Sequence, residues 1–340
     1  YAMLKPKEYN ADTFYEAWRN ILLFNEHTWG AYNSISEPDK PFVTDQWRIK
    51  KQYLLDGTDQ INNLEEELML PIINKQSTKI AVFNTLSWKR SGPVVIASSV
   101  NGKSVKNAGG KKMPLQKLSN GKFIFLATDV PALGSANYEI SEEEIDESKS
   151  DFVIGDNSLS NGKLSLQWDK QNGSITKLLA NDNFNYAGEF NKQGLNSYWY
   201  VPGLNPADAV SNGNVSVKIL EKGPVQTTIL FASSAPGANS LERKITLYAG
   251  CDVLEMENFL DKKAIRTKEA VHYGFPFNSS LKRTVVDAGY GTQQFLGDQL
   301  PGSNMDFLYG RRWMDVSSMD KGVQLMLLES PIIEPETMID

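Results

Sequence analysis

Hydrophobic residues recur at helical spacing in the first part of the chain, from residue 12 to residue 70. Thr13 and Glu16 have the spacing of a capping box, which indicates a helix start. The apolar face of this first helix carries Phe14, Trp18 and Ile21. In a second helix, ended by Pro71, the apolar residues recur every seven positions, at Trp47, Leu54, Ile61 and Leu68, and Leu64 adds to the same stripe. The pattern predicts part of an antiparallel helical bundle over residues 1–71, with these apolar stripes in its core.

Past Pro71 the pattern changes to short β-prone runs separated by turn residues. Three such runs, at residues 79–84, 92–97 and 122–127, predict a small β domain over residues 78–140. The next segment, residues 141–151, is dense in acidic side chains, which is typical of a solvated linker. A calcium-binding loop is the alternative for this acidic run, but its spacing matches no known calcium loop.

From residue 152 to residue 340 strands and turns alternate, and no segment has a convincing helical period. Asn161-Gly162 and Asn172-Gly173 are signals for tight hairpin turns. Apolar and polar residues alternate at residues 163–169, 215–219 and 241–247. We therefore predict a mainly β protein, in which a large antiparallel β-sandwich over residues 152–340 follows the helices and the small β domain.

Composition and charge exclude some classes of protein. A chain of 340 residues is long enough for two or three domains. Its net charge of −6 is unlike that of proteins that bind nucleic acid. It has no apolar run of the length that spans a membrane. Cys251 is the single cysteine, so an internal disulfide is impossible; both an exported and a cytoplasmic location stay open.

Only two histidines occur in the chain, His27 and His272. His27 follows three apolar residues and lies in the polar, aromatic run at residues 25–30, which is typical of a helix that ends at the rim of a site. A histidine at such a position can bind a metal, move a proton or hold a ligand, although a structural histidine bonded to a backbone carbonyl is the commoner case. His272 lies in an apolar run, where we expect a core or edge-strand residue.

Several motifs resemble glycoside hydrolase family 38, the zinc-dependent α-mannosidases. The segment Asn25-Glu-His-Thr-Trp-Gly-Ala-Tyr-Asn-Ser-Ile-Ser36, followed by residues 41–47, carries the first part of the resemblance. Further similar motifs follow in family order, at residues 82–88, 129–134, 172–178, 221–224, 311–316 and 329–333. The resemblance extends over nearly the whole chain from about Ala17. It implies a partial three-helix bundle, a small β domain and a large sandwich of the galactose mutarotase type.

The resemblance also implies that the chain is part of a longer enzyme. In this family an α/β barrel comes first and holds most of the metal site and the catalytic carboxylates. The present chain begins near the bundle, and it contains no His-x-Asp pair. We therefore expect no catalytic residue in this chain, and we expect the missing N-terminal barrel to be its partner.

By this resemblance His27 is one zinc ligand, and Glu26 orients its imidazole ring. One histidine cannot define a zinc site, because three or four protein ligands are usual. The expected activity of the longer enzyme is retaining hydrolysis of α-mannosides in mannose-containing glycans, through a nucleophilic carboxylate and an acid carboxylate. The chain alone is expected to be inactive and to bind zinc weakly.

Five residues are candidates for contact with substrate: Trp29, Tyr32, Tyr198, Trp199 and Asp208. Aromatic rings offer apolar faces to pyranose C–H groups, but packing is an equal alternative for the tryptophans and tyrosines. A non-catalytic carbohydrate-binding sandwich, with an exposed Trp199 as its platform, is an alternative function. A purely structural domain that scaffolds another chain is a third. Without the barrel, an apolar patch from Phe14 to Trp29 is expected to be exposed.

Overall fold

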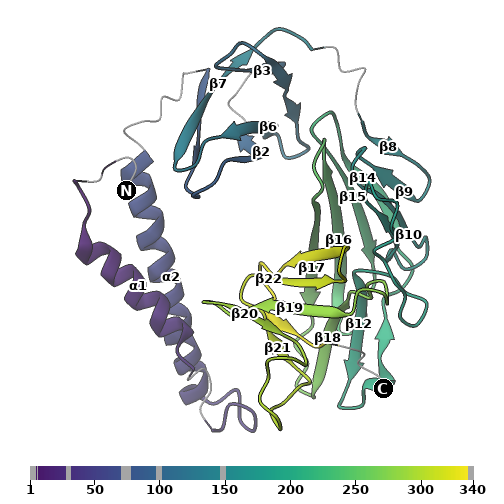
Figure 1. The fold of residues 1–340 in the computed structure, drawn as a ribbon. Helices are drawn as coiled ribbons and strands as arrows, with labels where there is room; N and C mark the ends of the chain where they lie inside the picture. Colours follow the sequence, from purple (N-terminus) through teal and green to yellow (C-terminus); the bar gives the residue numbers. More distant parts are fainter. Residues whose placement is uncertain are drawn as a thin grey trace. The chain divides into compact units, whose positions relative to one another are not determined.

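The computed structural model describes residues 5, 7–27, 32–69, 78–96, 102–145 and 151–335 (Figure 1). Trp29 and Pro71 lie outside these residues, as does part of the acidic run. The chain divides into two compact units, Tyr1–Arg90 with Asp129–Tyr138, and Ser91–Thr128 with Glu139–Asp340. Because this division cuts the small β domain, the expected boundaries between the domains stay a prediction.

The described residues from 5 to 69 contain two helices, α1 (Ala11–Asn25) and α2 (Pro41–Met69). The start of α1 differs from the expected capping box at Thr13, because the Asn10 side chain accepts a hydrogen bond from Thr13 N at 3.3 Å. Asn10 is therefore the N-cap, one of the residue types that satisfy the free N–H groups of a first turn. Neither of these two helices has the length and apolar character needed to cross a membrane.

The buried seam of α2 lies beside the stripe that the sequence predicted. Trp47 and Ile61 are 37 % and 45 % exposed, and Trp18 of α1 is 64 % exposed, so the prediction that these three residues lie in the core of the helix pair is wrong. The buried positions also recur every seven residues, at Val43, Lys50, Gly57 and Leu64, and of these the predicted stripe contained Leu64. Two of these residues are not apolar, which hid the seam. A Cβ atom on Gly57 would lie 2.9 Å from Ile21 Cδ1, so glycine lets the two helices approach closely.

In the described residues that follow the helices, up to residue 145, seven strands pair in two sheets, with the orders β1-β7-β3-β4 and β2-β6-β5. Their bounds are β1 Lys79–Asn84, β2 Arg90–Ile96, β3 Ser104–Asn107, β4 Lys112–Pro114, β5 Gln116–Lys117, β6 Phe123–Val130 and β7 Gly134–Ser141. The Gln116 side chain joins β5 to the next part of the chain, since its Oε1 accepts from Val225 N at 3.0 Å and from Gln226 N at 2.8 Å.

The remaining described residues, 151–335, form antiparallel sheets and confirm the mainly β prediction. The sheet orders are β11-β10-β9-β8, β13-β12-β18, β14-β15-β16-β17, β20-β19-β22-β23 and β21-β24. The first nine strands are β8 Val153–Ile154, β9 Ser158–Ser160, β10 Ser165–Trp168, β11 Ile175–Leu179, β12 Ser197–Pro202, β13 Val210–Ser211, β14 Ser216–Lys222, β15 Gln226–Ser233 and β16 Ala238–Tyr248. The others are β17 Leu254–Lys262, β18 Glu269–Gly274, β19 Arg283–Asp287, β20 Thr292–Gln294, β21 Leu308–Tyr309, β22 Trp313–Ser317, β23 Gly322–Met326 and β24 Ile332–Ile333. Within these residues the helical content is one 3-10 turn, η3 (Pro206–Asp208).

The main core of this β region lies between β9, β10 and β11 on one side and β15 and β16 on the other. Trp168 packs edge-on against Phe231, with ring centroids 5.5 Å apart. Both expected hairpins are confirmed, because β10 pairs antiparallel with β9 and with β11. Gly162 and Gly173 lie in the two connections and have φ angles of +80° and +74°. Because successive side chains of a strand point to opposite faces of the sheet, the alternation of apolar and polar residues places one face of each strand in the core.

Arg243 on β16 is a buried cation within this core, with 1 % of its surface exposed. Its guanidinium donates to Asn196 O at 2.7 Å and to Asn172 O. Burial lowers the pKa of Arg243 to about 10, because desolvation penalises its charged form. The arginine thus ties the Asn172-Gly173 turn to the start of β12 through backbone carbonyls.

The close approach of two backbones at Gly194 gives a test of this packing. A Cβ atom there would lie 1.9 Å from Ile175 O, a backbone atom that no side-chain rotation can move. We expect Gly194→Ala to lower the free energy of unfolding by roughly 3 kcal/mol or more in urea denaturation. The control is Gly291→Ala, where a Cβ atom meets nothing within 4 Å; an equal loss in both variants would contradict the argument.

Candidate functional site

A buried lysine of α2 holds the C-terminal end of α1. Lys50 Nζ donates to Leu23 O at 2.7 Å and to Glu26 O at 3.1 Å. The last carbonyl groups of a helix lack partners within the helix and carry partial negative charge. The Lys50 ammonium group satisfies two carbonyls where α1 ends, and so fixes where the following loop begins.

The same lysine positions Glu26, and Glu26 in turn positions His27. Glu26 Oε2 accepts from Lys50 Nζ at 2.8 Å, and Glu26 Oε1 lies 2.7 Å from His27 Nδ1. A carboxylate at this distance favours the tautomer with the proton on Nδ1, and leaves the lone pair of Nε2 available. The His27 side chain is 95 % exposed. Lys50 therefore holds Glu26, and Glu26 holds the His27 ring in a position exposed to solvent, where Nε2 is free to bind a ligand.

The described residues around His27 do not form a complete metal site. In the described part of the chain, no group of three His, Cys, Asp or Glu side chains could hold a metal ion. A complete zinc site needs three or four protein ligands, so the others would have to come from elsewhere. The role of His27 as a ligand stays a prediction, and the geometry is compatible with it.

The two aromatic residues expected near His27 give little further information. Tyr32 is almost fully exposed in the turn that leads to α2, so its ring is accessible to a ligand. Trp29 lies outside the described residues. Sugar stacking on either ring stays a prediction.

Tyr198 and Trp199 on β12 are core residues. Tyr198 has no exposed surface, and its hydroxyl donates to Pro236 O at 2.6 Å. Trp199 is 6 % exposed, and its Nε1 donates to Ser197 Oγ at 3.0 Å. Burial raises the pKa of Tyr198 to about 12. The expectation that Trp199 is an exposed platform is wrong, because its side chain is buried. A substrate contact by either residue stays untested.

A charged cluster lies at the end of β12, and Asp208, the last of the expected substrate residues, lies in the following turn. The Tyr200 hydroxyl donates to Glu269 Oε2 at 2.7 Å, and Lys262 pairs with the other carboxylate oxygen. The hydrogen bond from Lys262 lowers the pKa of Glu269, and the bond to Glu269 raises the pKa of Tyr200. Asp208 is exposed in η3 and joins no ion pair within the described residues.

His272 is an edge-strand residue, as expected, because β18 lies at the edge of its sheet. Its Nδ1 lies 3.1 Å from Glu334 Oε2, just past β24, and both side chains are half-buried. This contact joins β18 to the last described strand. The structure therefore gives His272 a structural partner.

The residue that sequence reasoning missed is Lys50. A lysine in a predicted helix is normally solvated, and nothing in its own identity signals burial. The signal was positional, since Lys50 lies seven residues after Val43 and seven before Gly57 on the seam facing α1. Only the packed helix pair shows that its side chain reaches the end of α1.

The charge of Lys50 can be removed with little change of volume. We expect Lys50→Met to cost roughly 1.5–3 kcal/mol, because Glu26 and two carbonyl groups lose a charged donor. Chemical denaturation followed by circular dichroism measures the loss, and hydrogen exchange should increase at the amides of residues 20–27. The neighbouring exposed residue gives the control variant Lys51→Met. Equal behaviour of the two variants would show that Lys50 does not hold the end of α1.

Comparison with known proteins matches the chain to a family model and to solved structures. Residues 159–330 match the model of the glycosyl hydrolases family 38 C-terminal domain. The structure is similar to that of an alpha-mannosidase from Enterococcus faecalis V583, with a TM-score of 0.63 and 12 % sequence identity. This likeness covers 95 % of the present chain but 46 % of the other, so the chain spans less than half of that protein. No curated protein matches the sequence. Because the family model covers half of the chain, the protein belongs to glycosyl hydrolase family 38, of which it carries the C-terminal domain.

Proposed function

We propose that this chain is part of a longer retaining glycoside hydrolase that acts on α-mannosides, to which it contributes one zinc ligand and the scaffold outside the catalytic barrel. Family membership supports the glycosidase class. The contact of 2.7 Å between Glu26 Oε1 and His27 Nδ1 carries the assignment of the ligand. Carboxylates in such positions orient metal-bound histidines and raise the basicity of the ring.

His27 would hold the metal through Nε2, with Glu26 as the group that fixes the ring. Bound zinc would act as a Lewis acid and as a template for sugar hydroxyl groups. The residues of this chain prepare the ligand: Lys50 fixes the end of α1, and Glu26 sets the tautomer and the direction of the imidazole ring. The nucleophile and the acid of a retaining mechanism are two carboxylates about 5–5.5 Å apart, and we assign both to the barrel that precedes this chain.

The exposed face of α1 supports a partner at this position. Tyr15, Trp18 and Leu22 lie three and four residues apart, and all three are exposed, Trp18 to 64 %. Side chains at this spacing form one stripe on a helix. The stripe lies away from the seam with α2, so α1 has a second apolar face. We propose that the remainder of the enzyme covers this face, because exposed apolar stripes of this kind mark interaction sites.

The alternative of a non-catalytic carbohydrate-binding module has lost the feature on which it depended. That function required an exposed ring at Trp199, which is packed in the sandwich. A glycosidase scaffold needs no such platform. The family and the geometry at His27 therefore favour part of an enzyme over a binding module.

The zinc assignment can be tested in the enzyme formed by this chain and its catalytic barrel. We expect His27→Ala to lower the zinc content and the hydrolysis of an aryl α-mannoside. Glu26→Gln should weaken zinc binding by about 10–100-fold, as loss of an orienting carboxylate does in other sites. The second histidine gives the control, since His272→Ala should leave the bound zinc unchanged. Full zinc occupancy in His27→Ala, measured by elemental analysis, would refute the assignment.

The exposed face of α1 predicts that the 340-residue chain, by itself, associates with other copies. Analytical ultracentrifugation should show a mass that rises with protein concentration. The double variant Trp18→Lys, Leu22→Lys should shift the chain towards monomer, because it places charge on the apolar stripe. The control is Lys51→Met, on an exposed position of α2. Monomeric behaviour of the unchanged chain at high concentration would argue against a missing partner on this face.

A further inference from the structure

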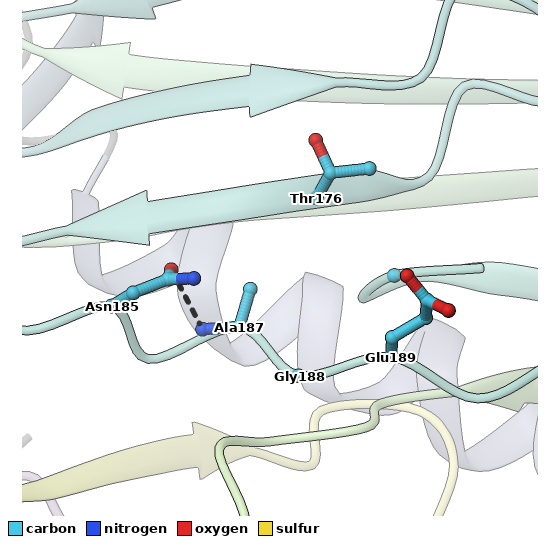
Figure 2. Close-up of a pocket in the computed structure, with 6 residues that line it drawn as sticks. Thr176, Asn185, Ala187, Gly188 and Glu189 are labelled. Atoms are coloured by element: carbon cyan, nitrogen blue, oxygen red, sulfur yellow. Dashed lines mark hydrogen bonds between the residues drawn. The ribbon is translucent and has the colours of Figure 1, made fainter. Parts of the chain in front are cut away.

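A hollow of about 270 Å³ lies between β11 and the segment that follows it (Figure 2). Six residues line it: Thr176, Asn185, Ala187, Gly188, Glu189 and Gly194. Its volume is just below the range of roughly 300–1,000 Å³ for sites that hold drug-sized ligands. The hollow therefore has room for one small molecule.

Irregular pairing produces this hollow. Gln167 pairs with Lys177 and Trp168 pairs with Ile175, so Thr176 is an extra residue that forms a β-bulge. Beyond β11, the chain is attached at two isolated bridges, Ile175 with Leu195 and Leu179 with Asn185. Between these two bridges the two segments do not pair regularly. Bulges are frequent next to functional sites, because they redirect side chains.

The far wall is held in an unusual backbone conformation. Gly188 and Gly194 pass so close to neighbouring carbonyls that a Cβ atom would lie 2.5 Å from Phe277 O or 1.9 Å from Ile175 O. Between them, Asn191 and Lys192 have φ angles of +45° and +62° and form a tight two-residue turn. Left-handed backbone at a lysine is strained, and such strain clusters at functional sites.

The polar groups in the hollow are both donors and acceptors. Asn185 Oδ1 accepts from Leu178 N at 2.9 Å and from Ala187 N at 3.2 Å, which fixes the amide plane. Its NH₂ group has no partner within the described residues, and Figure 2 shows the amide beside the hollow. Glu189 joins no ion pair in the described part of the chain, so its carboxylate is available as an acceptor. The hydroxyl of Thr176 donates to Gln167 O at 3.4 Å, so it offers a ligand an acceptor.

The amide N–H groups, the carboxylate and the hydroxyl that line the hollow together favour one class of ligand. A metal cation would be repelled by an amide that presents N–H groups, because the amide oxygen is already engaged. A phosphate or carboxylate would meet Glu189 with no basic side chain in the lining. Hydroxyl groups can donate to the carboxylate and accept from the amide at once. We propose that the hollow binds one unit of a neutral polyhydroxyl ligand, a hexose, through Glu189, Asn185 and Thr176.

This second sugar site does not depend on the function proposed above, except in the choice of mannose as the first probe. Binding can be measured on the 340-residue chain without zinc, barrel or catalysis. Loss of the sugar site would therefore leave the glycosidase assignment intact, and loss of that assignment would leave the sugar site intact.

The test is titration of the chain with methyl α-mannoside and methyl α-glucoside, by calorimetry and ligand-observed NMR. We expect binding in the millimolar range, weakened at least tenfold in Glu189→Gln. Asn185→Asp keeps an oxygen for the two backbone N–H groups but replaces the NH₂ donor with an acceptor, so it should also weaken sugar binding at least tenfold. The control is Glu329→Gln, the same change at an exposed residue outside the hollow, which should bind the sugars as well as the unchanged chain.

Titration with calcium chloride distinguishes a hexose site from a cation site. Asn185→Asp would strengthen a cation site, whereas it would weaken a sugar site. The proposal is overturned if neither sugar binds at tens of millimolar. It is also overturned if the two hollow variants bind sugar as well as Glu329→Gln, or if the hollow binds calcium and Asn185→Asp increases that affinity. Thermal unfolding of each variant confirms that it is folded when binding is measured.

Discussion

The candidate site depends on one buried ammonium group. Lys50 is removed from water at the centre of the helix pair, and a buried cation is costly unless charged or polar partners surround it. Its partners are Leu23 O, Glu26 O and the Glu26 carboxylate, all at the end of α1. One side chain thus determines where α1 ends, how Glu26 is turned and where His27 is presented. The close approach at Gly57 complements it, because the helices must be near each other for the lysine to reach.

The β region uses the same solution for its own buried cation. Within the described residues Arg243 pairs with no carboxylate, and the backbone carbonyl groups of Asn172 and Asn196 accept its hydrogen bonds. Backbone carbonyls are fixed in direction, so each of these cations specifies a geometry as well as satisfying a charge. In α1 the specified feature is the end of a helix, and in the β region it is a glycine turn against the start of β12. Both contacts join segments that are distant in sequence.

Regularly paired strands form the core of the β region, and the hollow at Glu189 lies where the pairing of strands is interrupted. The bulge at Thr176, the glycines at 188 and 194 and the left-handed turn at residues 191–192 all lie within about twenty residues of chain. Each weakens a sheet when taken alone, and together they leave a space lined by donors and acceptors. Function depends on such local sites more than on the regular strands, because one fold is shared by proteins of many functions.

The sequence by itself determined the mainly β class, the order of helices before strands, the two glycine turns and the family, since periodicity, turn residues and motif order are local properties. It also singled out His27 and Glu26, because they are adjacent and follow an apolar helix. Only the tertiary structure showed that Lys50 is buried, that the seam of α2 lies beside the expected stripe and that Trp199 is packed in the core. Those outcomes depend on which faces of distant segments meet. A lysine, a glycine or a tryptophan has the same letter in the sequence whether its neighbours in space are water or protein.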